Sequence, residues 1–412
     1  GGMNMKNIPE IRLKGFEGEW CYSKLENLSA FSKGQGYSKG NLNPTGNTPI
    51  ILYGRMYTNY EPIITHVDTF ANKKENSILS EGDEVIVPAS GETAEDISIA
   101  SAVVQKEVIL GGDLNIIKPH KELSPSFLAL SISNSKIHKE LSTKAQGKSI
   151  VHLHNEDLKK VSISYPNTNE QEAISTFFQN LDNLITEQKN KLENLQKVKK
   201  SMLCKMFPKE GQKIPEIRFK GFEGDWEEKK LEEIGYMTAG GTPSTLNPKY
   251  WNGNINWLQS GAIKNCIIYQ NSVIRKITKD GLSSSSAHLI RKDSVLIAIT
   301  GATCANIGYL TFPCSANQSV VSVETYNNFN AMFIYQTLLN QRNQILSYKG
   351  GSAQSGISLN SLEKITIAIP AYKEQQQIAN YLTAFDNQII LQNQRLKKLK
   401  QIKSALLSKM FV

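Results

Sequence analysis

The sequence contains few cysteines and no long apolar run, and both absences narrow the class of protein. Its 412 residues include five cysteines, none of them in a C-x-x-C pair, so neither a disulfide framework nor a cysteine zinc site is expected. No stretch approaches the roughly 18 consecutive apolar residues of a membrane span. The first residues, GGMNMK, have no apolar signal-peptide core. We therefore expect a cytoplasmic protein with no membrane association.

Motifs for nucleotide hydrolysis and for amino-group methylation are incomplete. The string GKS at 147–149 has Ser142 where the leading glycine of a phosphate loop must stand. An adenine or cytosine methyltransferase needs an Asn/Asp-Pro-Pro-aromatic motif to hold the target amine. The nearest strings, NPTG at 43–46 and NPKY at 247–250, lack the second proline. Neither activity is therefore expected of this chain alone.

Nuclease and metal motifs are equally weak. The nearest match to an acidic nuclease triplet is EDLK at 156–159, which lies before a predicted strand and not after it. His152 and His154, in HLHNED, alternate as side chains on one face of a strand do, but no third ligand follows at a useful spacing. A surface or nucleic-acid contact is the favoured interpretation of these two histidines.

Length, composition and charge indicate a globular protein with an affinity for polyanions. Hydrophobic residues make up 40% and charged residues 21% of the chain, as in ordinary globular proteins. The length exceeds what one hydrophobic core usually organises, so two or three domains are expected. Lysine and arginine number 47 against 38 acidic residues, a net charge of +9. Such a surface attracts nucleic acid but does not by itself demonstrate it.

An internal repeat is the first decisive feature. IPEIRLKGFEGEW at 8–20 recurs as IPEIRFKGFEGDW at 214–226, identical at 11 of 13 positions. The segment at 170–207 then matches 374–411 with 14 identities in 38 positions. The chain is therefore one unit used twice. Each unit consists of a short box, a variable stretch of about 145 residues and a shared terminal segment.

The two terminal segments are predicted to be long helices that pair with each other. No proline or glycine interrupts them, and apolar residues recur every three or four positions. A helix of about 36 residues is about 54 Å long, which suits a coiled coil. Gln188, Gln392, Lys199 and Lys403 lie within the stripe, where polar residues usually set the register. The predicted helix-pair interface is Ile174, Phe178, Leu181, Ile185, Leu192, Leu195, Met202, Ile378, Leu382, Phe385, Ile389, Leu396, Leu399 and Leu406.

The variable stretches, 21–165 and 227–369, are each predicted to be a mixed α/β domain. They contain strand-like runs bounded by turn residues, and each closes with a run that ends in proline just before the long helix. The runs are DEVIVPASG at 83–91, LNIIKP at 114–119, KKVSISYP at 159–166, DSVLIAITG at 293–301, SVVSVET at 319–325 and EKITIAIP at 363–370.

With these features the sequence resembles the specificity subunit of Type I restriction-modification enzymes, over nearly the whole chain. Besides the box and the EQ start of each long helix, the typical motifs are GGTPST at 240–245, YWNGNINWLQSGAIK at 250–264, ITGATCANIG at 299–308, SANQSVV at 315–321 and SGISLNSLEKITIAIP at 355–370. The first half is more divergent. GETAEDISIAS at 91–101 and VHLHNEDLKKVSISYP at 151–166 stand where ITGATCANIG and GISLNSLEKITIAIP do.

The resemblance implies two target-recognition domains, each reading one half of a split, asymmetric double-stranded DNA target, in a pseudo-twofold arrangement. Two antiparallel helices would join the domains and set the spacer. The expected segments are 1–165 and 209–369 for the domains, and 166–208 and 370–412 for the helices. The resemblance also implies two modification (methyltransferase) subunits docked on the helix pair, and restriction (motor-nuclease) subunits. S-adenosylmethionine, ATP and Mg²⁺ would belong to those partners, with no cofactor or metal in this chain and no catalytic residue.

Candidate DNA-binding residues are polar, basic and aromatic groups in loops between strands, because base edges demand donors and acceptors and phosphates demand positive charge. In the first half they are Lys33, Gln35, Tyr37, Lys39, Tyr53, Arg55, Tyr57, Ser90, Glu92, Thr93, Lys148, His152 and His154. In the second half they are Thr242, Ser244, Thr245, Tyr250, Trp251, Gln259, Ser260, Lys264, Thr300, Thr303, Asn306, Asn317 and Gln318. The run KGQGYSKG at 33–40 is attractive because glycine lets the backbone approach a phosphate that lysines neutralise.

Two alternatives stay open at this point. One is a self-sufficient methyltransferase or nuclease, and the other is a coiled-coil scaffold that only brings partners together. The bases that are read and the spacer length do not follow from one sequence, because readout depends on how side chains are placed in a groove.

Overall fold

The structure is a computed structural model that describes residues 7–144, 151–350 and 356–412. The chain forms two compact units, one of Gly1–Lys189 with Gln394–Val412 and the other of Asn190–Asn393. Each unit contains one mixed α/β domain and parts of both long helices. The compact units therefore divide within the helices, whereas the sequence-based segments divide at the helix ends. The four predicted segments stay a prediction of functional domains.

The long helices confirm the prediction from the apolar periodicity. Helix α7 is Thr168–Lys205 and helix α13 is Tyr372–Lys409, with 38 residues each. Among the described residues, no helix is both long and apolar enough to cross a membrane.

The two helices run in opposite directions where they meet inside each unit. In the first unit Lys403 pairs with Asp182, and Phe411 packs on Phe178. In the second unit the Lys199 Nζ lies 2.6 Å from Asp386 Oδ1. The register role predicted for the two lysines is therefore carried by ion pairs between helices. All fourteen residues of the predicted apolar stripe are buried or half-buried.

Five strands form the main sheet of the first unit in the order β2-β10-β6-β8-β4, antiparallel except for the parallel pair β4 and β8. Because side chains alternate along a strand, β6 contributes to both faces. Val85 and Val87 pack in the core with helix α4 (Pro125–Asn134), and Ile86 packs in a second core. The bounds are Ser29–Lys33 (β2), Leu114–Pro119 (β10), Glu84–Pro88 (β6), Ser101–Val103 (β8) and Ile63–Ile64 (β4).

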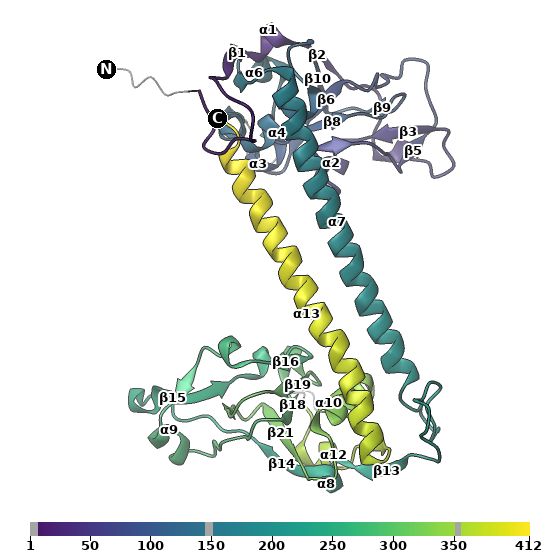
Figure 1. The fold of residues 1–412 in the computed structure, drawn as a ribbon, viewed down its shortest axis with the longest axis vertical. Coiled ribbons are helices and arrows are strands. Elements are labelled where there is room, and N and C mark those ends of the chain that lie inside the picture. The colour runs from purple at the N-terminus through teal and green to yellow at the C-terminus, as the bar shows by residue number, and fades with distance from the viewer. Residues whose placement is uncertain (1–6, 145–150, 351–355) are drawn as a thin grey trace. The chain divides into compact units, whose positions relative to one another are not determined.

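The main sheet of the second unit has the same order and directions, β14-β21-β18-β19-β16, with β16 parallel to β19. Val295 and Ile297 on β18 face the core that contains helix α10 (Ala331–Asn340), and Leu296 faces the other core. Figure 1 shows β14, β21, β18 and β19 as neighbours. The bounds are Gly235–Ala239 (β14), Val320–Thr325 (β21), Ser294–Ala298 (β18), Ile307–Leu310 (β19) and Cys266–Ile268 (β16).

The smaller sheets are duplicated as well. Each unit has a three-stranded sheet with one antiparallel and one parallel pair, in the orders β5-β3-β9 and β17-β15-β20. A two-stranded antiparallel sheet, β1-β12 or β13-β22, precedes each long helix. The bounds are Phe70–Ala71 (β5), Thr48–Ile51 (β3), Ile109–Leu110 (β9), Lys276–Ile277 (β17), Trp251–Leu258 (β15), Ser315–Ala316 (β20), Cys21–Lys24 (β1), Ser162–Tyr165 (β12), Glu227–Lys230 (β13) and Thr366–Ile369 (β22).

Short helices and one further strand pair complete the units. All six strand-like runs predicted from sequence contain strands, so that prediction is confirmed. The first unit also has α1 (Leu25–Leu28), α2 (Arg55–Thr58), α3 (Ala94–Ile97), α5 (Lys136–Lys144), α6 (Asn155–Lys159), β7 (Ser90–Gly91) and β11 (Val151–His152). The second has α8 (Leu231–Ile234), α9 (Lys279–Ser283), α11 (Arg342–Ser347) and α12 (Leu359–Glu363). The 3-10 turns are η1 (Lys39–Asn41), η2 (Pro248–Tyr250), η3 (Ser260–Ala262), η4 (Gln270–Ser272) and η5 (Gly301–Thr303).

Candidate nucleic-acid interface

The repeated box attaches each domain to the start of a long helix. Arg12 donates from Nε and Nη2 to the two carboxylate oxygens of Glu170, at 2.7 Å each. Arg218 does the same to Glu374, at 2.7 and 2.8 Å. Both carboxylates are buried, and these bonds raise the pKa of both arginines. The box is therefore a structural clasp, and its near identity in the two halves follows from this shared role.

The end of a long helix completes the core of each domain. Phe411 packs against Phe127 and Phe178 in the first unit. Phe207 packs against Trp226 and Phe333 in the second. The Met-Phe pair that both repeats share at this end thus fills a core in each domain.

The glycine-rich loops at 33–40 and 240–245 occupy equivalent places in the two domains. Gly34 N donates to Leu114 O at 2.9 Å, and Gly240 N donates to Val320 O at 2.9 Å. Each loop leaves the edge strand of the main sheet and crosses to the small sheet. The sequence alone did not reveal this correspondence, because KGQGYSKG and GGTPST share too few residues.

Gly34 serves internal packing and not the approach of a phosphate. A Cβ atom built on it would lie 1.9 Å from Gly111 O, so no other residue fits there without a shift of the backbone. Gly36 has φ +73°, and a Cβ atom there would meet nothing within 4 Å. The sequence predicted that glycines here let the backbone approach a phosphate. For Gly34 this prediction is wrong, because the atoms close to it belong to the protein's own backbone.

Tyr37, predicted to contact DNA, is buried in the same loop. Its hydroxyl lies 2.6 Å from Ser77 Oγ and accepts from Lys74 N at 2.7 Å. The Lys74 ammonium lies 4.6 Å from the centre of its ring. The structure therefore gives Tyr37 an anchoring role and does not support a DNA contact. Lys33, Gln35 and Lys39 are exposed.

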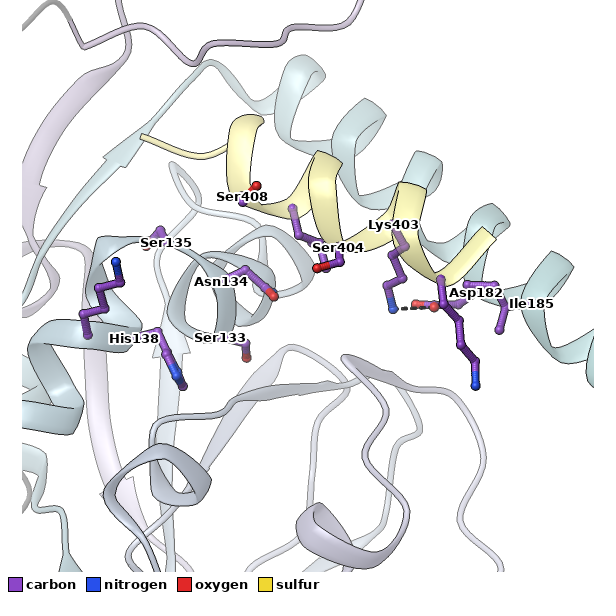
Figure 2. Close-up of a pocket in the computed structure, with 12 residues that line it drawn as sticks. Ser133, Asn134, Ser135, His138, Asp182, Ile185, Lys403, Ser404 and Ser408 are labelled. Atoms are coloured by element: carbon purple, nitrogen blue, oxygen red, sulfur yellow. Dashed lines mark hydrogen bonds and ion pairs between the residues drawn. The ribbon is translucent and has the colours of Figure 1, made fainter. Parts of the chain in front are cut away.

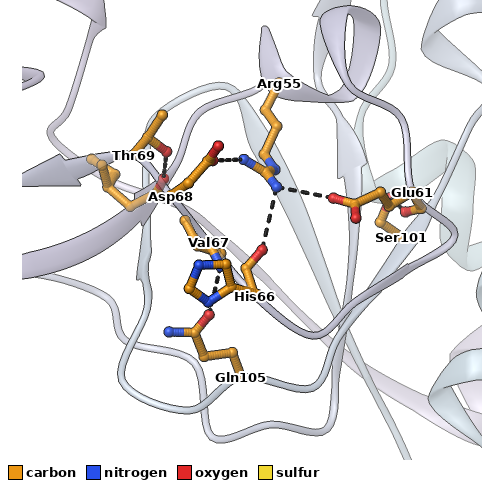
Figure 3. A network of polar contacts seen from close by, with 9 residues as sticks. Arg55, Glu61, His66, Val67, Asp68, Thr69, Ser101 and Gln105 are labelled. Carbon is orange, nitrogen blue, oxygen red and sulfur yellow. Dashed lines mark hydrogen bonds and ion pairs between the residues drawn. The ribbon is translucent and has the colours of Figure 1, made fainter. Parts of the chain in front are cut away.

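Arg55 is the clearest departure from the predicted set. Its side chain is 11% exposed, and it donates to Asp68 Oδ1 at 2.6 Å and to Glu61 Oε2 at 2.9 Å. Figure 3 shows the guanidinium between these carboxylates and the carbonyl of His66. The hydrogen bond from Arg55 lowers the pKa of Asp68. Because two carboxylates already match its charge, the structure does not support a phosphate contact by Arg55.

The other aromatic and polar candidates of the first domain gather around the β7-β11 pair. The Tyr57 hydroxyl donates to Ser90 O at 2.6 Å, and His152 pairs with Ser90 across the two strands. The rings of Tyr53 and Tyr57 meet edge to face. Burial and the nearby Asp96 raise the pKa of Tyr57. The Tyr57 hydroxyl is therefore protonated, and it is already donated to a backbone carbonyl within the domain.

The two histidines have the arrangement expected from alternation. The rings of His152 and His154 are parallel, with centroids 6.3 Å apart, and both side chains are exposed. Among the described residues no group of three or more His, Cys, Asp and Glu side chains is placed to hold a metal ion. Of the remaining candidates, Glu92 and Thr93 are exposed, Ser90 is buried, and Lys148 lies outside the described residues.

In the second domain the candidates form two groups. Thr242 donates to Gln318 Oε1 at 2.5 Å, joining the glycine-rich loop to the loop after β20. Asn306 accepts at Oδ1 from Arg342 at 3.0 Å and donates from Nδ2 to Ile263 O at 2.9 Å. Asn306 therefore positions the loop that carries the exposed Lys264. Arg342 was missed from sequence, because nothing in its helix marks it out.

None of the thirteen candidates of the second domain is fully buried. Ser244, Thr245, Gln259, Lys264 and Gln318 are exposed. The half-buried ones are Thr242, Tyr250, Trp251, Ser260, Thr300, Thr303, Asn306 and Asn317. The neighbouring Trp257 is a core residue at 2% exposure, with its indole N–H donated to Gly241 O.

A pocket of about 510 Å³ lies in the first unit beside the long helices. Ser133 and His138 line one side of it, and Asp182, Lys403 and Ser404 line the other. Figure 2 shows Lys403 directed at Asp182 across the helix pair. In the second unit Gln336 donates to the equivalent Asp386 at 2.9 Å. The first unit carries Leu130 at the position of Gln336, so its aspartate lacks this amide partner.

Comparison with known proteins matches this architecture. A family model described as the Type I restriction modification DNA specificity domain matches residues 17–196 and again 223–401. The specificity subunit of the Type I restriction enzyme MjaIX of Methanocaldococcus jannaschii is 27% identical over 194 residues, 46% of this chain and 44% of that one. The EcoR124I/EcoR124II specificity subunit of Escherichia coli is 29% identical over 170 residues, 40% of this chain and 42% of that one.

The matched segments thus span less than half the length of both curated relatives. A solved structure covers more of the chain. The S subunit of a Type I restriction-modification system from M. genitalium superposes with a TM-score of 0.64 at 16% identity, covering 98% of this chain and 99% of that one. The two proteins share a fold across both repeats.

Proposed function

The chain belongs to the family of Type I restriction-modification DNA specificity domains, and on this basis we propose that it is the DNA-reading subunit of such a system. Each of its two domains reads one half of a gapped double-stranded target. The observation that carries the proposal is the double family match, which covers both repeats. In this proposal partner subunits catalyse methylation and cleavage, and this chain selects the DNA sequence on which they act.

The side chains in the loops around the main sheets favour a different half-site for each domain. The two domains have one topology, but the side chains at equivalent positions differ. Ser90 and Thr300 hold the same place after the central strand, as do Gly36 and Thr242 in the glycine-rich loops. Hydrogen-bond readout depends on which donors and acceptors a groove meets. Two such surfaces therefore read unlike sequences, and the target is asymmetric.

The helix pair is proposed to set the spacer between the half-sites and to dock two modification subunits. Support comes from the two ion pairs at equivalent places, Lys403 with Asp182 and Lys199 with Asp386. Paired helices with a specified register fix a separation that a flexible linker would not. S-adenosylmethionine would be bound by the modification subunits, and ATP and Mg²⁺ by the restriction subunits, in the cytoplasm.

The test is the methylation pattern of a host that expresses this chain with its modification subunits. The expected result is a two-part motif with an unread gap, methylated on each strand. Replacing the second domain should change one half of the motif and leave the other half and the gap. An ungapped motif, or a motif unaffected by domain exchange, would contradict the proposal.

Purified protein separates the two alternatives. Transfer of a labelled methyl group, or Mg²⁺-dependent cutting, by this chain alone would indicate a self-sufficient enzyme. For a scaffold, Lys33→Ala and Lys264→Ala would leave the DNA affinity and its salt dependence untouched. For a DNA reader, each lost phosphate contact flattens the slope of log affinity against log salt by about one unit.

A further inference from the structure

One arginine of the second domain is held over two tryptophans. The Arg275 guanidinium carbon lies 4.5 Å from the centre of the Trp251 ring and 5.2 Å from that of Trp257. The indole rings meet edge to face at 5.1 Å. Each ring is itself fixed by a hydrogen bond to the glycine-rich loop, from Trp251 Nε1 to Ser244 O at 3.1 Å and from Trp257 Nε1 to Gly241 O at 3.0 Å.

Arg275 makes no ion pair within the described part of the chain, and it is exposed. Four of the other arginines, among them Arg55, have their charge matched by a carboxylate. Arg12 and Arg218 hold buried glutamates, and Arg291 pairs with Glu324 at 3.2 Å. A guanidinium stacked on indoles loses little side-chain freedom when it binds, and its N–H groups stay available for an acceptor.

The surroundings of Arg275 are basic. Lys276 is the next residue in the sequence and begins β17. Lys249 and Lys279 lie in the adjoining η2 and α9. All three lysines are exposed, and none has an ion pair among residues 7–144, 151–350 and 356–412. Between positions 240 and 292 the sequence has one acidic residue, Asp280. The ligand that this chemistry selects is a polyanion with its charges spaced along a surface.

The first domain lacks this arrangement at the equivalent position. Trp257 N donates to Arg275 O at 2.9 Å, and Ile50 N donates to Thr69 O at 2.9 Å. The small sheets therefore align with Thr69 in place of Arg275 and Ile50 in place of Trp257. The stacked guanidinium is an addition to the second domain and not a requirement of the fold.

We infer that Arg275, stacked on Trp251 and Trp257 and flanked by Lys276, binds a phosphate of the DNA backbone beside the loop 240–245. The inference rests on the proposed function and extends it to a contact that the sequence did not indicate. Phosphate contacts of this kind fix the position and orientation of a domain on the duplex without reading bases. The second domain would then make a charged contact with the DNA backbone that the first domain does not make.

The test compares Arg275→Ala, Arg275→Lys and Arg291→Ala in the full chain assembled with its modification subunits. The probe is a fluorescent DNA duplex of mixed sequence, titrated over a range of salt concentrations. Arg275→Ala should weaken binding about tenfold at low salt, as the loss of one charge-assisted contact does. It should also reduce the salt slope by about one unit. Arg275→Lys should keep the slope, because it keeps the charge.

Arg291→Ala is the matched control, since it removes an arginine of the same domain whose charge Glu324 already matches. It should leave the salt slope unchanged. The inference is overturned if the unaltered assembly binds the probe with a steep salt slope and Arg275→Ala does not alter that slope, even where Arg275→Ala lowers the melting temperature. A flat slope for the unaltered assembly would instead overturn the proposed function, and this inference with it.

Discussion

The two domains share one topology and differ in charge. Between the first and third strands of the main sheet, residues 34–83 of the first domain carry four Lys and Arg against five Asp and Glu. The equivalent residues 240–293 of the second carry seven against two. The buried strands keep the same apolar alternation in both. Because a fold depends on buried alternation and not on exposed charge, the surfaces were free to diverge.

The parts that join each domain to the helices did not diverge. Arg12 and Arg218 make the same bidentate bonds, to Glu170 and Glu374. Gln171 and Gln375 both donate to the carbonyl of the proline before the helix, at 2.8 and 2.9 Å. Changing the partner of a buried charged side chain destabilises the fold, whereas an exposed loop tolerates substitutions. The comparison therefore separates a constant attachment from a variable surface.

The largest effect is expected at the attachment of each domain to its long helix, which is the same in both units. Arg12→Ala and Arg218→Ala should each destabilise their own unit by about 3–5 kcal/mol, because each leaves a buried carboxylate without its partner. Native-state hydrogen exchange read by mass spectrometry would report each unit separately. Equal losses in the two units are expected.

Lys230→Ala is the control for this pair, since Lys230 and Glu232 form an exposed ion pair. It should change stability by less than about 0.5 kcal/mol. If Arg12→Ala cost no more than this control, the clasp would not be what attaches the domain.

A smaller effect is expected on the surface of the first domain, which differs from that of the second. Arg55→Ala should destabilise the first unit by about 1–2 kcal/mol, through lost hydrogen bonds and packing of its stem. It should leave the salt slope of DNA binding unchanged, because Asp68 and Glu61 already match its charge. Lys33→Ala, which removes an exposed lysine of the same domain, is the comparison variant. A fall of about one unit in the Arg55→Ala slope would reinstate Arg55 as a phosphate contact.

The smallest effect is the difference between the two ion pairs that join the long helices. Lys199→Met should cost about 1–2 kcal/mol and Lys403→Met about half as much, because the first ion pair is the more buried and shares its aspartate with Gln336. Urea unfolding of each variant, followed by hydrogen exchange in the two units, would measure the difference. Equal costs would show that Gln336 adds nothing to the pair.

Much of the architecture could be predicted from the sequence. The repeat, both long helices and the strand-like runs depend on patterns that are local in the chain, and the structure has them where predicted. The candidate site was harder. Side chains such as Tyr37 and Arg55 have the chemistry of a DNA contact, but their partners Ser77, Asp68 and Glu61 lie 6–40 residues away. Arg275 was overlooked because its two indole neighbours precede it by 18 and 24 positions.

The sequence by itself determined that a half-molecule is duplicated, that each half ends in a long amphipathic helix, and which family the whole resembles. Periodicity and repetition are properties of the chain and need no coordinates. Only the tertiary structure decided which cations are free and which are neutralised, because charge matching depends on groups that folding brings together. It also showed that two dissimilar glycine-rich loops hold the same place, since backbone hydrogen bonds preserve a register after the side chains have changed.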